Sequence, residues 1–327
     1  MTAVAEFDLI ERIRQRTPAR ADVVLGIGDD AALVQVPAGR QLVVCADTLN
    51  EGVHFPVGTA AADIGWKALA VNLSDLAAMG AEPAWCTLSL SLPSPDAAWL
   101  DGFLDGFLAL AMQHGVALVG GDTTRGPLSV SVTAHGFVEP GRALLRGGAR
   151  AGEDLWVSGT LGDAAAALAL LEQGAPGALR ARLDRPTPRV ALGRVLPGLA
   201  TAAVDVSDGL LADLGHVCRA SGVGAEVELD RLPTSDALRD PFAPEHRPAL
   251  QATGGDDYEL CFTAPPDRAD AIRAAADAAA TPVTCVGRIV PGHAVTARGA
   301  DGRPWVPARS GYEHFGAGNE WRGTRNE

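Results

Sequence analysis

Near its beginning, the chain carries Leu25-Gly26-Ile27-Gly28-Asp29-Asp30-Ala31-Ala32, where two glycines precede two adjacent carboxylates inside an apolar run. Glycine adopts backbone conformations that are closed to other residues, and it lets a ligand approach the main chain closely. Successive side chains of an extended segment point to opposite faces, so we expect only one of the two carboxylates to point inward. Taken alone, such a string is more typical of a solvated turn than of a binding site. Its meaning depends on whether similar strings recur along the chain.

Length and composition limit the classes of protein that fit. A chain of 327 residues exceeds one typical hydrophobic core, so we expect two domains. The apolar fraction of 47% and the charged fraction of 20% are those of a soluble globular protein. We expect no signal peptide, because the N-terminal segment lacks an apolar core, and no membrane span, because the alanine-rich windows are too short.

Cysteine and histidine usage indicates a reducing compartment and disfavours zinc. The cysteines are odd in number, scattered and mostly within apolar runs: Cys45, Cys86, Cys218, Cys261 and Cys285. We therefore expect free thiols without a disulfide framework, and the cytoplasm as the default location. The seven histidines show no paired spacing of the kind that zinc sites use.

The charge balance excludes several ways of binding phosphate. A formal net charge of −13 argues against a nucleic-acid-binding protein, which would normally carry a basic surface. Lys67 is the only lysine, and no Gly-Lys-Ser/Thr string exists, so a P-loop is excluded. The sequence around Lys67 looks helical, which disfavours the strand lysine of protein kinases. An acidic chain that handles phosphates would need metal ions to do so.

Carboxylates recur after predicted strands. Asp47 follows a buried strand predicted at residues 41–46, and it begins a loop that also brings a hydroxyl and an imidazole. Asp122 follows a short strand predicted at residues 116–119 and has glycines beside it. Residues just past strand ends are placed where α/β folds usually bind ligands. The alternative for each segment taken alone is an ordinary loop that ends a strand and has no binding role.

Three more carboxylates stand out, one within an apolar helix and two at the end of a strand. Asp75 lies among leucines and alanines in a helix predicted at residues 60–79, where an unpaired buried charge would be costly. An exposed polar helix face is the alternative for that residue. Asp205 and Asp208 lie at the end of a strand predicted at residues 202–206.

The carboxylates together indicate a metal site. If they converge, each pair at about 4 Å costs about 4 kcal/mol at an effective dielectric of 20. Only bound cations would hold such a cluster together at neutral pH. Ligation by oxygen alone suits magnesium, which usually shares its coordination shell with substrate phosphates. The sequence therefore predicts a phosphoryl-transfer site with several magnesium ions.

Six strings also resemble, in order, the motifs of the thiamine-monophosphate kinases, a family of the aminoimidazole-ribonucleotide-synthase-like superfamily. They are GIGDDAA at 26–32, DTL at 47–49 with GVHF at 52–55, NLSDLAAMG at 72–80, GGDTTRG at 120–126, DVSDGL at 205–210 and DYEL at 257–260. The resemblance extends over about residues 6–315. One string would be weak, whereas six in order are specific.

The resemblance implies an α/β (α+β) fold with two domains. An N-terminal domain, residues 1–139, would hold a mixed sheet with helices, bind metal and nucleotide, and pair with a second copy in a homodimer. A hinge at residues 140–152, rich in glycine, would lead to a C-terminal α/β sandwich domain at residues 153–315. Residues 316–327 would form a flexible tail.

The resemblance also implies an activity and a set of site residues. The activity is transfer of the ATP γ-phosphoryl group to thiamine monophosphate, giving thiamine diphosphate, with magnesium ions as cofactors and without a membrane or nucleic-acid partner. The implied metal ligands are Asp30, Asp47, Thr48, Asp75, Asp122, Asp205 and Asp208. The implied ATP contacts are Gly121, Asp122, Arg146 and Ser207, and the implied thiamine contacts are His54, Glu259 and Tyr312.

We expect direct in-line transfer with no protein nucleophile. A phosphate-monoester acceptor has a second pKa of about 6, so its attacking oxygen is already anionic at pH 7. Two departures from the family pattern stand out: Cys45 and Ala46 replace hydroxyl residues, and Asp256 replaces a glutamate. Two alternatives stay open, namely another ATP-using member of the superfamily and a catalytically silent nucleotide-binding module.

Overall fold

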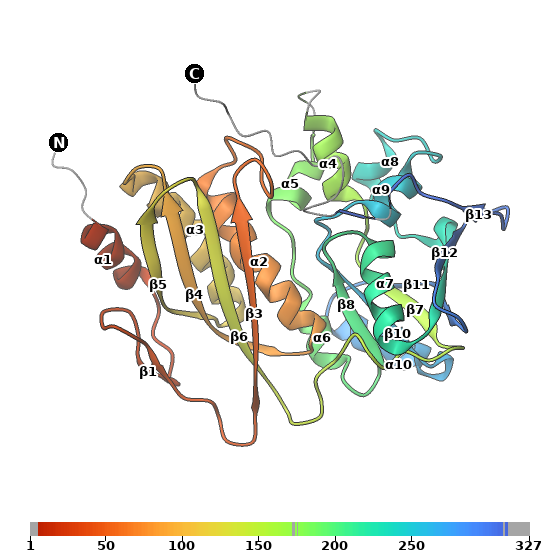
Figure 1. Cartoon of the computed structure of the whole chain (residues 1–327), viewed down its shortest axis with the longest axis horizontal. Helices are drawn as coiled ribbons and strands as arrows, with labels where there is room; N and C mark the ends of the chain where they lie inside the picture. Colours follow the sequence, from red (N-terminus) through yellow and green to blue (C-terminus); the bar gives the residue numbers. More distant parts are fainter. Residues whose placement is uncertain (1–5, 172–173, 175, 310, 313–327) are drawn as a thin grey trace.

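The computed structural model describes residues 6–171, 174, 176–309 and 311–312. The predicted tail at residues 316–327 and the first five residues lie outside this part. The described residues form a four-stranded sheet, a seven-stranded sheet and a two-stranded hairpin. Figure 1 shows the four-stranded sheet in one half of the molecule and the seven-stranded sheet in the other. The fold is mixed α/β, as the sequence predicts.

The N-terminal half holds the hairpin and the four-stranded sheet. Its elements are α1 (Glu6–Arg16), β1 (Val23–Leu25), β2 (Leu33–Val34), β3 (Gln41–Asn50), α2 (Ala61–Ala78), β4 (Glu82–Leu92), α3 (Ala97–His114), β5 (Ala117–Arg125) and β6 (Ser129–Val138). The strand order is β3-β6-β4-β5, and only the β4–β5 pair is parallel. Helices α2 and α3 cover one face of this sheet (Figure 1).

The C-terminal half is a sheet with helices on both faces. Its elements are β7 (Asp154–Ser158), α4 (Asp163–Leu171), α5 (Leu179–Asp184), α6 (Val190–Val195), β8 (Ala202–Val206), α7 (Leu210–Ser221), β9 (Gly224–Glu228), η1 (Leu229–Arg231), α8 (Asp236–Arg239), α9 (Arg247–Thr253), β10 (Glu259–Ala264), η2 (Pro266–Arg268), α10 (Ala269–Ala278), β11 (Val283–Val290), β12 (Val295–Arg298) and β13 (Pro304–Trp305). The strand order is β13-β12-β9-β11-β7-β10-β8.

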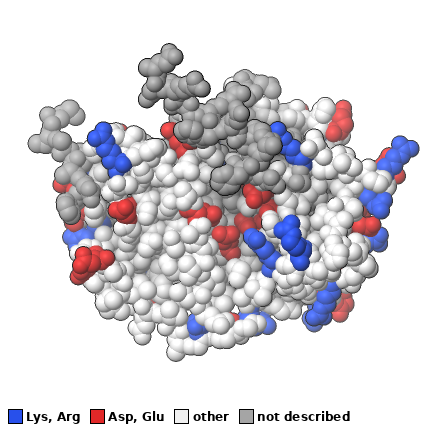
Figure 2. Space-filling model, viewed as in Figure 1, with Lys and Arg blue, Asp and Glu red and all other residues white. Residues whose placement is uncertain are grey.

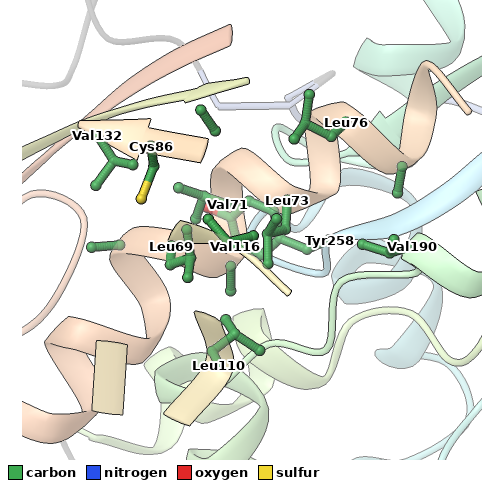
Figure 3. Packing of buried hydrophobic residues seen from close by; sticks show 14 of the residues in the cluster. Leu69, Val71, Leu73, Leu76, Cys86, Leu110, Val116, Val132, Val190 and Tyr258 are labelled. Atoms are coloured by element: carbon green, nitrogen blue, oxygen red, sulfur yellow. The ribbon is translucent and has the colours of Figure 1, made fainter. Parts of the chain in front are cut away.

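Helix α2 lies between the two sheets and belongs to the cores of both halves. Thirteen of its 18 residues are buried, as expected for a helix that is apolar on nearly every side. It packs against α3 and the four-stranded sheet on one side, and against α6, β8 and β10 on the other. Figure 3 shows Leu69 and Leu76 of α2 in one apolar cluster with Val132 of β6 and with Val190 and Tyr258 of the other half. One continuous core therefore joins the halves.

Two strand predictions are wrong in length, and one of them also in burial. Strand β3 continues to Asn50 and β5 to Arg125, so Asp47 and Asp122 lie within strands and not in loops after them. Pairing explains the extension, because Asp47 lies opposite Val132 on β6, and Asp122 opposite Ser89 on β4. β3 was expected to be buried, yet it alternates between exposed and half-buried residues, since it is an edge strand of a sheet covered on one face.

The long helix containing Asp75 is α2, and all five cysteines are free thiols. None of the described helices is both long and apolar enough to span a lipid bilayer.

Candidate active site

A cavity of about 400 Å³ is lined by residues of both halves. Its walls comprise Ala46, Asp47, Thr48, Leu49, Val53, His54, Val71, Asp75, Leu168, Asp205, Ser207, Asp208, Gly255, Asp256, Tyr258 and Tyr312. Figure 2 shows acidic side chains gathered near the middle of the face in view, with basic side chains beside them. The acidic residues of the cavity lining thus come from both halves.

Four of the predicted carboxylates line this cavity. Asp47 comes from β3, Asp75 from α2, Asp205 from the end of β8, and Asp208 from the turn that follows β8. The Ser74 hydroxyl donates to Asp205 Oδ2 at 2.8 Å and fixes that carboxylate. Carboxylates from three separate parts of the sequence therefore meet at one cavity, whereas Asp30 and Asp122 are not part of its lining.

Burial and mutual repulsion raise the pKa values of three of these carboxylates, those of Asp47, Asp75 and Asp205. Burial, followed by the charges of Asp205 and Asp47, raises the pKa of Asp75 to about 8. Burial also raises the pKa of Asp205 to about 6, with Asp47 adding to the effect, and it raises the pKa of Asp47 with help from Asp208. A cation placed among these groups would reverse each shift, because it favours their ionised forms.

Arg146 opposes part of this repulsion from outside the cavity lining. It lies in the predicted hinge, and its charge lowers the pKa values of both Asp75 and Asp205. Its carbonyl oxygen accepts a hydrogen bond from Ser221 Oγ at 3.2 Å, which ties the segment to α7. The predicted ATP-binding arginine is thus within electrostatic range of the carboxylates.

The turn that carries Ser207 and Asp208 is held by a residue that the sequence analysis missed. Asp213 Oδ2 accepts the backbone N–H groups of Ser207, Asp208 and Gly209 at 3.0, 3.0 and 3.1 Å. An aspartate in the first turn of α7, six residues after Ser207, is the sequence signal for such a turn-organising carboxylate. The turn therefore presents Ser207 and Asp208 to the cavity in a defined conformation.

His54 and Tyr312 also line the cavity. His54 lies in a tight hairpin after β3, and its Nδ1 accepts the Asn50 N–H at 2.9 Å. The neutral ring then carries its proton on Nε2. The Tyr312 N–H donates to the Asp208 carbonyl at 3.0 Å, which attaches the C-terminal segment to the turn after β8. Two predicted thiamine contacts thus lie on the cavity wall.

Asp30, Gly121 and Asp122 do not line the cavity. Asp30 is exposed in the loop between β1 and β2, and β5 lies three strands away from β3, about 14 Å at the usual strand spacing. Gly121 has φ +147°, and an added Cβ would lie 1.8 Å from the Leu88 carbonyl oxygen, so only glycine fits beside β4.

A row of polar side chains links Asp122 to the cavity. Thr48, Ser131, Ser89 and Asp122 lie opposite one another across β3, β6, β4 and β5, so they share one face of the sheet. Thr48 and Ser131 are hydrogen-bonded through their hydroxyls at 2.7 Å. This face is the one that α2 and α3 leave uncovered. The row therefore extends the polar cavity wall across the open sheet.

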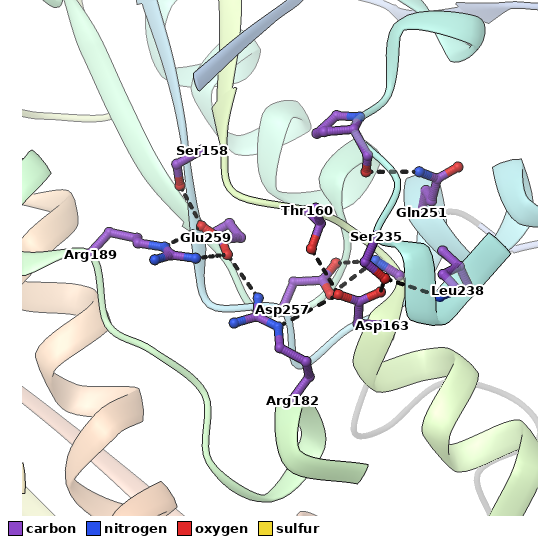
Figure 4. Close-up of polar contacts among 12 residues, drawn as sticks. Ser158, Thr160, Asp163, Arg182, Arg189, Ser235, Leu238, Gln251, Asp257 and Glu259 are labelled. Atoms are coloured by element: carbon purple, nitrogen blue, oxygen red, sulfur yellow. Dashed lines mark hydrogen bonds and ion pairs between the residues drawn. The ribbon is translucent and has the colours of Figure 1, made fainter. Parts of the chain in front are cut away.

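Glu259 lies outside the cavity lining, fully buried in a cluster of ion pairs (Figure 4). It accepts hydrogen bonds from Arg182 Nη2 at 2.8 Å, from Arg189 Nε at 2.6 Å and from Ser158 Oγ at 2.6 Å. These contacts tie β10 to α5, α6 and β7. Direct contact between the substrate and Glu259 would require these ion pairs to open. Its thiamine-binding role stays a prediction, because Glu259 does not reach the cavity.

Asp256 and Tyr258 line the cavity instead, in the turn before β10. Both residues have positive φ values, +67° and +51°, and such backbone strain is concentrated at functional sites. Leu168 of α4 and Val53 add exposed apolar surface to the walls. The Gly-Gly-Asp-Asp-Tyr string was a visible signal for the turn, whereas Leu168 gave no signal in the sequence.

The donor chemistry of the cavity suits magnesium. No group of three or more His, Cys, Asp or Glu side chains in the described part of the chain is placed to hold a metal ion. Magnesium, however, usually takes only one or two protein carboxylates and completes its shell with water and substrate phosphates. Carboxylates spread around a cavity fit ions that bind together with a nucleotide.

Two family models match consecutive parts of the chain. AIR synthase related protein, N-terminal domain, matches residues 28–138, and AIR synthase related protein, C-terminal domain, matches residues 150–299. Together they extend over most of the chain.

Curated and solved relatives match nearly the full length. Thiamine-monophosphate kinase of Escherichia coli (strain K12) is 46% identical over 321 residues, which is 96% of this chain and 99% of the relative. The crystal structure of thiamine-monophosphate kinase from Stenotrophomonas maltophilia K279a is 58% identical with a TM-score of 0.86, over 92% of this chain and 98% of that one. A structure described as AaThiL complexed with AMPPCP and TMP is 33% identical with a TM-score of 0.75, over 95% and 97%.

Proposed function

Because the chain belongs to the thiamine-monophosphate kinase family, we propose that it transfers the γ-phosphoryl group of ATP directly to thiamine monophosphate at a site with several magnesium ions. The observation that carries the proposal is the cavity whose lining combines Asp47, Asp75, Asp205 and Asp208 with His54 and Tyr312. The carboxylates suit metal-bound phosphates, and the two aromatic side chains suit an organic ring.

Phosphate would be held on the carboxylate side. Asp47, Thr48, Asp75, Asp205 and Asp208 supply oxygen ligands for magnesium, and magnesium when bound neutralises phosphate charge and orients the transferred group. Arg146 adds a fixed positive charge near Asp75 and Asp205. The relative complexed with AMPPCP and TMP supports ATP and thiamine monophosphate as the two ligands.

The remaining predicted residues would act along the open face of the sheet. We infer that the polyphosphate of ATP extends from the cavity along the row from Thr48 to Asp122, which would bring Gly121 and Asp122 into contact with the nucleotide. Asp30, in the exposed glycine-containing loop, would close on the same phosphates as an additional metal ligand. This arrangement accounts for predicted ligands that lie outside the cavity.

The thiamine moiety would bind on the apolar side. Tyr312, Tyr258 and Leu168 offer ring and aliphatic surface, and His54 Nε2–H is a hydrogen-bond donor. The acceptor phosphate then points toward the carboxylate wall. No general base is required, because a phosphate monoester is already anionic at neutral pH, and positioning with charge neutralisation is the main source of catalysis in phosphoryl transfer.

We also propose that a second copy of the chain covers the open face of the four-stranded sheet. Val24, Leu33, Leu42 and Val44 are 69%, 56%, 43% and 55% exposed along β1, β2 and β3. Exposed apolar side chains on one face are typical of interaction surfaces. A homodimer through this face would bury them and enclose the nucleotide that we place along the row ending at Asp122. The five free thiols fit a reducing compartment, which supports the cytoplasm as its location.

The test is a product analysis. The purified chain is incubated with ATP, magnesium and either thiamine or thiamine monophosphate, and the products are separated. We expect thiamine diphosphate only from the monophosphate, and no product in EDTA. ADP formation without thiamine diphosphate would favour another ATP-using activity of the superfamily. Nucleotide binding without turnover at any magnesium concentration would favour the silent module.

A further inference from the structure

Lys67 is a charged side chain that is buried inside the molecule, where an ammonium group is costly unless it has partners. It lies on α2, is 1% exposed, and is the only lysine of the chain. Its Nζ donates to the His54 carbonyl oxygen at 2.9 Å and pairs with Asp256 Oδ1 at 3.1 Å. A buried ammonium group is tolerated only when it is paired and hydrogen-bonded. Both of its partners belong to residues that line the cavity, one in each half of the molecule.

The partner on the C-terminal side belongs to a strained turn. Asp256 and Tyr258 have φ values of +67° and +51°, and the Tyr258 hydroxyl donates to the same Asp256 Oδ1 at 2.9 Å. The Asp256 N–H donates to the Ser207 carbonyl at 2.8 Å, which connects this turn to the turn after β8. The ion pair with Lys67 therefore fixes a conformation that the backbone alone disfavours.

The partner on the N-terminal side is the His54 hairpin. The Asn50 carbonyl accepts the N–H groups of both Val53 and His54, and the Asn50 N–H donates to the imidazole. The carbonyl that Lys67 binds is thus part of a compact unit that positions the ring. Through one ammonium group, Lys67 connects this unit to the Asp256 turn.

We propose that Lys67 is a positioning residue. It sets the distance between the His54 hairpin and the Asp256 turn, the two walls of the cavity between which thiamine monophosphate binds. The proposal rests on the proposed function. Lys67 also neutralises Asp256, so that this carboxylate holds the wall in place and is not available to the magnesium ions. Loss of Lys67 would loosen the thiamine-binding part of the cavity and leave the Asp256 carboxylate without its ion pair. The hydrogen bond from Ser74 to Asp205 and those of Asp213 to the turn after β8 do not involve Lys67.

The test compares Lys67→Met, Asp256→Asn and the double variant, with Trp66→Phe as the matched control. Trp66 precedes Lys67 on α2, and its Nε1 donates to the Pro186 carbonyl at 2.9 Å, so its replacement removes another contact between the halves away from the cavity. For each variant, KM for thiamine monophosphate, KM for ATP and kcat are measured, together with the affinity for thiamine monophosphate by calorimetry and the melting temperature.

We expect Lys67→Met to raise KM for thiamine monophosphate and its dissociation constant about 10-fold or more, with KM for ATP changed less than about threefold. The double variant should bind thiamine monophosphate better than Lys67→Met, because it lacks the unpaired carboxylate. Trp66→Phe should leave both KM values within about twofold of wild type. If Lys67→Met does not fold, Asp256→Asn, which keeps the lysine, should still raise KM for thiamine monophosphate selectively.

Equal changes in the two KM values, or KM for thiamine monophosphate within twofold of wild type in both Lys67→Met and Asp256→Asn, would overturn the role of Lys67. An additive double variant would also count against it. These outcomes leave the proposed function intact, because wild-type turnover is measured in the same series. A wild-type chain that makes no thiamine diphosphate would overturn both.

Discussion

At the scale of single residues, Asp75 shows how the charges of the cavity oppose one another. Burial, then Asp205 and Asp47, raise its pKa from 3.8 to about 8. Because the pKa in the folded chain is the higher one, the stability that this group contributes is complete below about pH 4 and is lost as pH rises through about 8. A metal-free chain at pH 9 thus holds an ionised carboxylate that its surroundings disfavour.

Asp75→Asn removes this charge while it keeps the shape of the side chain. In EDTA at pH 9, we expect the variant to be more stable than wild type by on the order of 2 kcal/mol, with the difference vanishing near pH 4. Urea unfolding across this pH range measures the difference. Magnesium with ATP should stabilise wild type more than the variant, and turnover of the variant should fall at least about 100-fold. Parallel pH profiles would show that Asp75 is not destabilised by its neighbours.

Candidate site residues were easier to identify from the sequence than the contacts that surround them in the fold. Asp47, Asp75, Asp205 and Asp208 could be predicted because a carboxylate next to glycines or inside an apolar helix is chemically conspicuous. Glu259 could not be placed, because its partners Arg182 and Arg189 are more than 60 residues away in the chain. Asp256 stands out in the sequence only as a departure from the family pattern, because its ion pair with Lys67 depends on the packing of the two halves.

At the scale of elements, the strand predictions stopped too early for a definite reason. Polar residues after an apolar run usually mark the end of a strand, yet β3 and β5 continue through theirs. They can do so because polar side chains on the uncovered face of the sheet need no apolar environment, while the backbone stays paired. Burial of both faces was therefore the wrong assumption, whereas the helix predicted at residues 60–79 agrees with α2.

Strand β5 offers a matched pair of glycine substitutions. Gly121→Ala places a Cβ 1.8 Å from the Leu88 carbonyl oxygen at φ +147°, whereas a Cβ on Gly120 would meet nothing within 4 Å. We expect Gly121→Ala to lower the free energy of unfolding by about 3 kcal/mol or more, and Gly120→Ala to change it by less than about 1 kcal/mol. Chemical denaturation of the two variants measures both values. Similar values for the pair would mean that β5 and β4 can separate without cost.

At the scale of the whole molecule, we expect the uncovered sheet face to determine whether two copies of the chain associate. Val44→Asp places a charge at the centre of the proposed contact between two copies, where a carboxylate would be desolvated. We expect the mass in solution, measured by light scattering, to fall from that of two chains to that of one.

Val306→Asp is the control for that experiment, because Val306 is 85% exposed and lies next to β13 in the other half. It should leave the mass unchanged. A Val44→Asp variant with the mass of wild type would contradict the proposed contact.

The length of the chain predicts two domains, each with its own hydrophobic core. In the structure, one core runs through α2 into both halves.

The single buried lysine has a practical consequence for chemical labelling. Acylating reagents react with an unprotonated amine in contact with water, and the only lysine side chain of this chain, Lys67, is buried. In the closed molecule its ammonium group is held by Asp256 and by the His54 carbonyl. Acylation of residue 67, followed by peptide mapping, would therefore report how often the two walls separate. The rate at which Lys67 is acylated thus measures separation of the His54 hairpin from the Asp256 turn without any introduced label. Bound thiamine monophosphate should slow this reaction.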